Sequence, residues 1–201
     1  MKGQPIHLVK KHPFVGACGL PCGLCPRYHS GGEKPCPGCC GPGFWERHPS
    51  CPTITCCVKQ HGLEVCGECN ELEFCPRVLR NLEAAKRADS FISYRTLPFN
   101  LTEVKERGIK AAADSLQERI EFLRLLIREH DDGRSKGFYC LCVQLLPLDR
   151  LKSALAGAQQ QMTTGLTPKE QTRLVREGFG KLADEMRVEL RLRNGKAAKS
   201  T

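Results

Sequence analysis

The chain has 201 residues, a formal net charge of +9 at neutral pH and fourteen cysteines. No stretch approaches the roughly 18 apolar residues that a membrane-spanning helix needs. The first residues, interrupted by Pro5, Pro13 and several charges, lack the pattern of a secretory signal peptide. We therefore expect a soluble, cytoplasmic protein that does not act in a membrane.

Twelve of the fourteen cysteines lie between Cys18 and Cys75, in tight pairs and triples. In a reducing compartment such clustering indicates metal binding; a disulfide framework, which an oxidising compartment would allow, is the alternative. Residues 1–77 are also rich in glycine and proline and have little periodic apolar pattern. Because this segment cannot bury a sufficient apolar core, we expect metal to supply its folding energy.

Structural zinc sites take four Cys or His ligands, usually from two Cys-x-x-Cys knuckles brought together by the fold. Three such knuckles are present, and each has a glycine between its cysteines, where we expect the turn to need backbone freedom: Cys22/Cys25 with Gly23, Cys36/Cys39 with Gly38, and Cys66/Cys69 with Gly67.

Twelve cysteines would fill three four-cysteine sites, but neighbouring residues such as Cys39-Cys40 and Cys56-Cys57 rarely chelate one ion together. Fewer filled sites are therefore expected, and the spacing does not partition the ligands among them. A histidine could complete a site, from His29, His48 or His61. The candidate metal ligands are Cys18, Cys22, Cys25, Cys36, Cys39, Cys66, Cys69 and Cys75, with Cys51 and Cys56 in second rank.

Zinc is the favoured metal, and a [4Fe-4S] cluster is the alternative. Iron–sulfur clusters also use four cysteines, and a Cys-Pro step, which commonly ends ferredoxin-type runs, occurs four times, at Cys25, Cys36, Cys51 and Cys75. Four thiolates alone do not decide between the two. The run CGLPCGLC also has the CxxxCxxC spacing of radical S-adenosylmethionine enzymes, but the barrel that such enzymes need does not follow it.

The run ACGLPCGLCPRY, followed by CPGC, CCVKQHGLEVCGEC and FCPR, resembles the cysteine-rich proteins of anaerobic bacteria and archaea grouped as domain of unknown function 3795. The later segments FISYRTL and DDGRSKGFYCLCVQLLPLDRLKSAL are similar to the longer members of that family. The resemblance covers nearly the whole chain. It implies a metal-binding module and a cytoplasmic setting, and it implies no established activity.

Residues 78–201 have helical apolar spacing, so we expect a small, irregular, metal-stapled module (residues 1–77) followed by an all-α domain (residues 78–201) with a basic C-terminal tail. Asn100 or Thr102 is expected to cap a long helix that ends before Gly133. Thr167 and Glu170 form a capping box with a proline at the first helical position. The other expected helices are 76–88, 138–146, 148–160 and 168–185, and 188–194 is expected as a short strand or further helix.

Residues 131–142, DDGRSKGFYCLC, stand apart from the helical pattern. The simplest interpretation is a helix–turn–helix junction with Cys140 and Cys142 as small buried hydrophobes. The functional alternatives are an anion-binding turn with Arg134 and Lys136, or a role for Cys140 as a metal ligand or redox partner. On a helix, cysteines two residues apart cannot face one site.

No catalytic triad, phosphate loop or dinucleotide motif is present, and none of the histidines has the spacing of a catalytic metal pair; His130 is expected to interact with a helix terminus. We expect a non-enzymatic module with a protein partner, or alternatively an iron–sulfur redox or auxiliary enzyme component. Nucleic-acid binding is a third hypothesis, weakened because thiolates bound to zinc cancel much of the positive charge. Its positive charge would come from the tail residues Arg187, Arg191, Arg193, Lys196 and Lys199.

Overall fold

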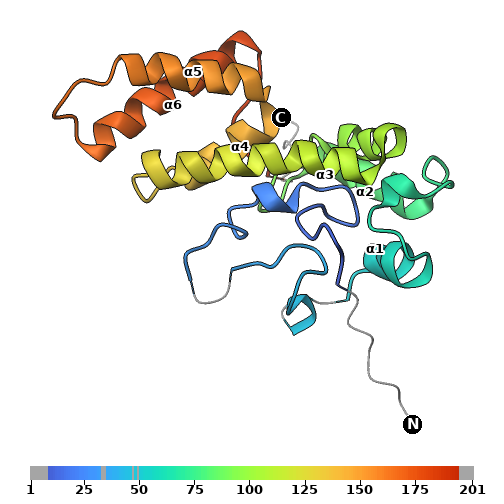
Figure 1. Ribbon diagram of the computed structural model, residues 1–201. Coiled ribbons are helices and arrows are strands. Elements are labelled where there is room, and N and C mark those ends of the chain that lie inside the picture. The colour runs from blue at the N-terminus through green and yellow to red at the C-terminus, as the bar shows by residue number, and fades with distance from the viewer. Residues whose placement is uncertain (1–8, 33–34, 47, 49, 195–201) are drawn as a thin grey trace, which may run out of the picture.

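A computed structural model describes residues 9–32, 35–46, 48 and 50–194, and all regular structure within those ranges is helical (Figure 1). The predicted all-α architecture after residue 78 is therefore confirmed. The longer helices are α2 (Pro76–Arg87), α3 (Leu97–His130), α4 (Lys136–Leu145), α5 (Leu148–Gln160) and α6 (Pro168–Glu185). The cysteine-rich part holds only short turns of helix: η1 (Cys22–Leu24), η2 (Phe44–Glu46), α1 (Pro52–Ile54), η3 (Thr55–Gln60) and η4 (Cys66–Glu68).

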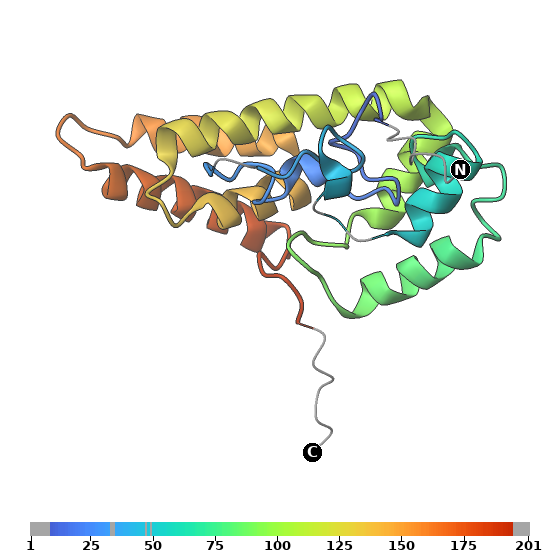
Figure 2. The same cartoon turned by 90° about the horizontal axis from the view of Figure 1, so that it is seen from below.

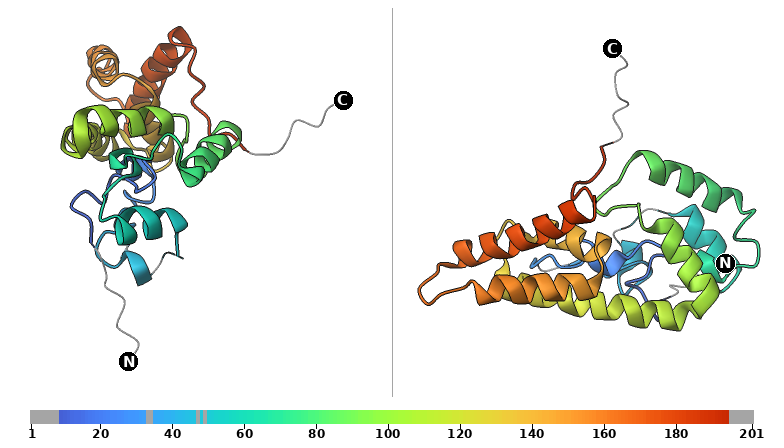
Figure 3. Two further views of the ribbon diagram at one scale, coloured as in Figure 1. Left: turned by 90° about the vertical axis from the view of Figure 1, so that its right-hand side faces the viewer. Right: turned by 90° about the horizontal axis from the view of Figure 1, so that it is seen from above.

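Helix α3 is the central element of the fold. The cysteine-rich segment packs along one side of it, and α5 and α6 form an antiparallel pair on the other, as the views in Figures 1 and 3 agree. Seen from below in Figure 2, the same segment lies along α3, and η1 also contacts α4. Gly108 has φ 79° and ψ 160°, so α3 consists of two helical stretches that meet at this residue.

The beginning of α3 differs from the prediction. The helix starts at Leu97, with Pro98 in its first turn and Thr96 before it, so neither Asn100 nor Thr102 caps it. Instead, the Asn100 side-chain amide donates to the carbonyl oxygen of Gly19 at 2.9 Å. Proline tolerates the first turn because its missing N–H would have no partner there. Asn100 therefore attaches α3 to the cysteine-rich segment.

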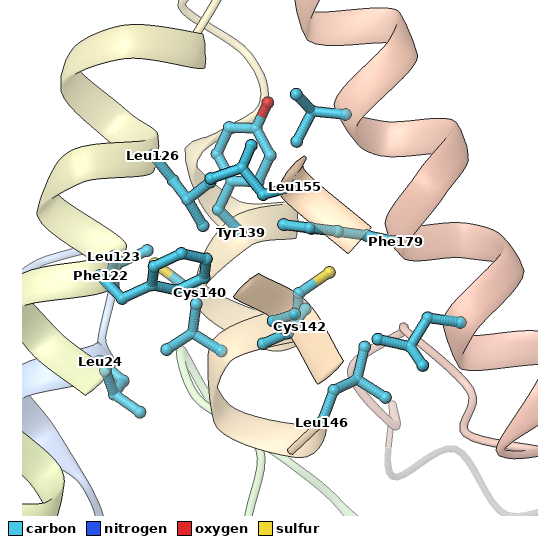
Figure 4. Close-up of a cluster of buried hydrophobic side chains, with 14 of the residues drawn as sticks. Leu24, Phe122, Leu123, Leu126, Tyr139, Cys140, Cys142, Leu146, Leu155 and Phe179 are labelled. Atoms are coloured by element: carbon cyan, nitrogen blue, oxygen red, sulfur yellow. The ribbon is translucent and has the colours of Figure 1, made fainter. Parts of the chain in front are cut away.

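The C-terminal helices match the prediction closely. Thr167 and Glu170 form the expected capping box at the start of α6, and α5 has the predicted bounds. Helices α3 to α6 share one core, in which the Tyr139 and Phe179 rings meet edge to face at 6.2 Å (Figure 4). Locally encoded caps and apolar spacing thus determined these elements.

The hydrophobic cores cross the predicted boundary at residue 77. Leu24, from η1, is buried in the core of α3 to α6. Val15 and Val65 belong to a second core together with Leu97 and Val104 of α3. The cysteine-rich segment therefore folds against the helices over a shared apolar interface, and its autonomy as a domain stays a prediction.

Residues 188–194 form neither the strand nor the helix that was expected. They run as irregular chain held by side chains from residues 89–95. Arg193 donates to the fully buried Asp89 carboxylate at 2.8 Å, and Arg95 donates to the carbonyl oxygens of Glu189 and Arg191. In a strand or a helix, backbone partners would satisfy the carbonyl groups of this segment; here the Arg95 side chain does so for Glu189 and Arg191. Lys196 and Lys199 lie outside the described residues.

Candidate metal centre

Two of the three knuckles have the same backbone geometry. Cys22–Leu24 (η1) and Cys66–Glu68 (η4) are each one turn of 3₁₀ helix, and the second cysteine, Cys25 or Cys69, follows in an extended conformation. The N–H of Cys25 donates to the carbonyl oxygen of Cys22 at 3.1 Å, and the N–H of Cys69 donates to that of Cys66 at 3.0 Å. The identical C-G-x-C sequences therefore fold into equivalent turns.

The glycines of these two knuckles are needed for close packing on α3. A Cβ at Gly67 would lie 2.7 Å from both the Leu101 carbonyl oxygen and the Val104 Cβ, and one at Gly23 would lie 2.3 Å from Ile120 Cδ1. Neither glycine has a positive φ, so the expectation that these turns need glycine for backbone freedom was wrong for Gly23 and Gly67. Both knuckles thus press their backbones directly onto one helix.

The third knuckle, Cys36–Cys39, does need backbone freedom. Gly38 has φ +80°, a backbone conformation that residues with a side chain rarely adopt, and a Cβ there would lie 2.3 Å from the Pro13 carbonyl oxygen. That oxygen accepts a hydrogen bond from the Cys39 N–H at 2.7 Å, and the Cys36 N–H donates to Arg27 O at 3.0 Å. The knuckle is therefore fixed at both ends to the preceding chain.

Ala17 connects two of the knuckles. Its N–H donates to the Cys39 sulfur at 3.3 Å, and its carbonyl oxygen accepts from the Cys66 N–H at 2.8 Å. Cys39 and Cys66 consequently both contact Ala17, although they are 27 positions apart in the chain. A backbone N–H that points at sulfur stabilises the thiolate form, which is the metal-binding form.

A small cavity of about 20 Å³ is lined mainly by sulfur-bearing side chains, and we call it the sulfur cavity. Five cysteines border it, and His61, directly after η3, adds an imidazole. Its apolar wall is Leu63, Leu72 and Val78, and its cysteines are Cys56, Cys57, Cys66, Cys69 and Cys75; the Cys57 thiol is hydrogen-bonded to Cys66. Cys56, placed in second rank by the sequence, thus joins three first-rank candidates.

In each adjacent cysteine pair one member is buried and acts as a hydrogen-bond donor. The Cys40 thiol donates to Cys39 and lowers the pKa of Cys39 to about 6, against the effect of burial. Cys57 has two acceptors in reach, the Leu63 carbonyl oxygen at 3.6 Å and the Cys66 sulfur, and the second contact lowers the pKa of Cys66. Cys40 and Cys57 therefore support neighbouring sulfurs.

Lys10 is a buried cation that sequence reasoning missed. Only 6 % of the residue is exposed, and its ammonium donates to the Val15 carbonyl oxygen at 2.6 Å. No carboxylate pairs with Lys10 within the described ranges. Its positive charge lowers the pKa of Cys22, Cys39 and Cys66, so the ammonium lies among the thiols. A buried charge is costly unless an opposite charge compensates it, and the neighbouring cysteines can supply that charge as thiolates.

Cys18 and Cys22 lie in the same buried region. Burial raises the pKa of Cys18 to about 12, although the N–H of Leu20 lowers it; negative charge on Cys39 and Cys51 would raise it further. Burial likewise raises the pKa of Cys22, and Cys39 is the next largest influence. These four thiols are near enough to repel one another as thiolates, so only a bound cation would allow them to ionise together.

The remaining candidates lie at the edges of this region. Cys36 has its sulfur 3.8 Å from His48 Nε2, and the His48 ring stacks on Phe44 at 4.2 Å. Burial raises the pKa of Cys25, and Cys36 is near enough to add to that effect. The third histidine is engaged elsewhere, because His29 Nε2 lies 2.7 Å from the Gly23 carbonyl oxygen.

In the described ranges, no three Cys, His, Asp or Glu side chains lie close enough together to bind one metal ion. The sulfur cavity nevertheless fits zinc on two counts. Its donors are thiols and an imidazole, the ligands that zinc prefers, and its volume of about 20 Å³ exceeds the roughly 10–15 Å³ that a water-sized particle requires. Coordination would require the thiols to turn toward the cavity, and a four-iron cluster would require it to expand.

The segment 131–142 has the simpler of the expected structures. Cys140 and Cys142 are buried in the helical core, Cys140 beside Leu24 and Phe122 and Cys142 on the side of Phe179 (Figure 4). The Asp131 carboxylate accepts the N–H groups of Gly133 and Ser135, and Asp132 accepts that of Arg134. The carboxylates of Asp131 and Asp132 thus already occupy the backbone N–H groups that an anion-binding turn would offer to a ligand.

Two side chains of this region differ from their expected roles. The Lys136 ammonium donates to the His29 carbonyl oxygen at 3.4 Å and so contacts the cysteine-rich segment. The His130 ring is buried at the end of α3, and neither ring nitrogen has a hydrogen-bond partner within the described part of the chain. It is the His130 carbonyl oxygen that is bonded, to the hydroxyls of Tyr139 and Thr172.

No family model, curated protein or solved structure matches the chain. The resemblance to domain of unknown function 3795 therefore stays a prediction. Within the described residues, no helix has the length and apolar character needed to cross a membrane.

Proposed function

We propose that the protein binds zinc through cysteine thiolates and acts as a non-enzymatic interaction or regulatory module. The sulfur cavity is the observation that carries this proposal, because four candidate ligands, Cys56, Cys66, Cys69 and Cys75, border a space of about 20 Å³. Zinc bound there would link η3, η4 and the start of α2, and the fold would gain the cross-link that its small apolar cores lack.

Lys10 gives independent support for an anionic centre. Four thiolates around one Zn²⁺ carry a net charge of about −2, and the buried ammonium lies among the thiols with no carboxylate partner in the described ranges. A metal–thiolate centre would compensate this charge, whereas neutral thiols would leave it buried alone. The same argument holds for an iron–sulfur centre at Cys18, Cys22 and Cys39, which is the alternative.

An interaction role is supported by apolar side chains next to the sulfur cavity. Phe74, directly before Cys75, is 81 % exposed, and Leu79 on the next turn of α2 is half exposed. Zinc binding at Cys75 would fix the position of both for a protein partner. The hypothesis of nucleic-acid binding has less support, because Arg193 of the basic tail is paired with Asp89.

The test is elemental analysis for zinc and iron on protein purified without oxygen or added metal. We expect zinc, a loss of about one equivalent in Cys69→Ser, and faster proteolysis of residues 50–75 in that variant. Cys142→Ala, buried in the helical core, is the control that should retain its metal. Iron in place of zinc would establish the iron–sulfur alternative. Unchanged metal content and protease resistance in Cys69→Ser would refute the proposal.

A further inference from the structure

A second cavity lies beside η1, and it shares no lining residue with the sulfur cavity. It has a volume of about 430 Å³, within the range of small-molecule sites. Five parts of the chain line it: the end of η1 with Pro26, residues 91–92, α4 with the preceding Arg134, Arg176 of α6, and residues 190–192. We call it the arginine pocket, because Arg134, Arg176 and Arg191 are part of its wall.

The floor and sides of the arginine pocket are apolar. Leu24 and Cys140 belong to the buried core at its base, as Figure 4 shows for both residues. Phe91, Phe138 and Leu141 add further carbon surface, and the described part of the chain contributes no aspartate or glutamate to the lining. An apolar interior with cations at its edge is suited to a ligand that has an apolar body and an anionic group.

The three arginines differ in how far they are already engaged. Arg191 lies 3.3 Å from the Glu189 carboxylate. The Arg176 guanidinium donates to Ser135 Oγ at 3.1 Å and stacks 4.5 Å from the centre of the Phe138 ring, which fixes its position. The Arg134 guanidinium has no acceptor within the described part of the chain. Arg134 and Arg176 therefore retain donors for an anion, and a guanidinium binds carboxylates and phosphates through paired N–H groups.

We propose that the arginine pocket binds a small organic anion, with its carboxylate or phosphate at Arg134 and Arg176 and its aliphatic body over Leu24, Phe91 and Leu141. The sequence pointed to Arg134 through an anion-binding turn, but the donors here are guanidinium groups, of Arg134 in the bend before α4 and of Arg176 on α6. The arginines in the wall, with no aspartate or glutamate among the described lining residues, favour this ligand class.

Isothermal titration calorimetry on the full chain, with its metal as purified, tests this proposal. The probes are octanoate and octyl phosphate, with octan-1-ol as the uncharged control. We expect one or both anions to bind and the alcohol to bind at least tenfold more weakly. The double variant Arg134→Ala, Arg176→Gln should weaken anion binding by about ten- to a hundredfold, the effect of losing charge-assisted hydrogen bonds. Arg173→Ala, one turn away on α6, should bind as the wild type does.

Gly137 provides a variant that closes the pocket without disturbing the charges. It lines the cavity, and a Cβ there would meet no atom within 4 Å. Gly137→Leu should therefore fill the space, and it also improves the helix propensity of α4. Gly180→Leu on α6, where a Cβ likewise meets nothing, is the matched control.

Loss of anion binding in Gly137→Leu but not in Gly180→Leu supports the site. The proposal is overturned if neither anion binds, if octan-1-ol binds as tightly as the anions, or if Gly137→Leu and the arginine variant bind like the wild type. Because none of these variants touches the sulfur cavity, failure here leaves the zinc proposal standing.

Discussion

The N–H of Ala17 donates to the sulfur of Cys39 at 3.3 Å, and the carbonyl oxygen of the same residue accepts from Cys66. One peptide segment thus positions two knuckles that the sequence alone could not pair. The first contact also lowers the pKa of Cys39, since an N–H directed at sulfur favours the thiolate. Alanine at this position is 1 % exposed, so the segment itself lies inside the thiol-rich region.

Lys10→Met should weaken metal binding without removing any ligand. The substitution deletes a buried ammonium that lies among the thiols, so the negative charge of a metal–thiolate centre would lose its nearest compensation. We expect zinc to transfer to a chromogenic chelator about tenfold faster, a change of about 1.4 kcal/mol in the barrier. The exposed neighbour Lys11→Met is the control. Equal transfer rates in Lys10→Met and the wild type would contradict an anionic centre near Lys10.

Gly67→Ala should destabilise the protein far more than the addition of one methyl group suggests. The added methyl would lie 2.7 Å from the backbone oxygen of Leu101, which cannot move aside as a side chain can. Overpacking of this kind costs about 1–3 kcal/mol, to be measured as a lower urea midpoint. Gly23→Ala should cost less, because its nearest obstacle is the flexible end of Ile120. Gly31→Ala, with open space around it, is the control; a midpoint for Gly67→Ala equal to that of Gly31→Ala would refute the packing argument.

The helices of the C-terminal half were predictable because their signals are local. The Thr167–Glu170 capping box and Pro147 place the starts of α6 and α5 within the sequence itself. The start of α3 was not predictable in this way, since Asn100 has the residue type of a cap but bonds to Gly19 across 81 positions. The cysteine spacing identified the candidate ligands, but it did not predict which cysteines lie together in one site.

Lys10 and Cys56 show why the grouping failed. In the sequence, a lysine in a polar, irregular segment is indistinguishable from a solvated surface lysine. The burial of Lys10 results from long-range contacts, such as the hydrogen bond from its backbone N–H to the Cys40 carbonyl oxygen. Cys56 has second rank in the sequence, but it lines the sulfur cavity together with Cys57, whose thiol is hydrogen-bonded to Cys66. A pattern of spacings has no information on which knuckles meet.

Arg193→Ala should release the C-terminal segment, lower stability near neutral pH and make stability less sensitive to acid. Burial alone would raise the pKa of Asp89, but the hydrogen bonds from Arg193 and from the Tyr94 N–H outweigh it and lower the pKa to about 2. The resulting stabilisation is present above the ordinary value of 3.8 and is lost as the pH falls toward 2. Removing the arginine leaves a buried carboxylate without its cation, at a cost of about 2 kcal/mol near neutral pH.

The measurement is the free energy of unfolding of wild type and Arg193→Ala from about pH 7 to about pH 3. The difference between them should shrink toward the acid end of this range, because Asp89 takes up a proton in the variant before it does so in the wild type. The exposed Arg191→Ala is the control and should change stability by less than about 0.5 kcal/mol. A difference that does not depend on pH would show that the Asp89–Arg193 pair is not its source.

His130→Leu should reduce the loss of stability in mild acid. Burial lowers the pKa of His130, the opposing effect of Glu129 is smaller, and the ring has no hydrogen-bond partner within the described residues. A depressed pKa means that the unfolded chain binds the proton more readily, so stability falls as the pH drops below 6.5. Leucine removes this group and two unpaired buried nitrogens, and it keeps the carbonyl that Tyr139 and Thr172 use.

Near pH 7, we expect the free energy of unfolding of His130→Leu to equal or exceed that of the wild type. The difference in favour of the variant should grow by about 1 kcal/mol by about pH 5. Urea unfolding at a series of pH values measures both quantities. His29, whose pKa burial also lowers, provides the comparison, since His29→Leu removes the bond to Gly23 and should lower stability at neutral pH. If the His130→Leu and wild-type curves run parallel between these pH values, the buried His130 is not the proton-sensitive group.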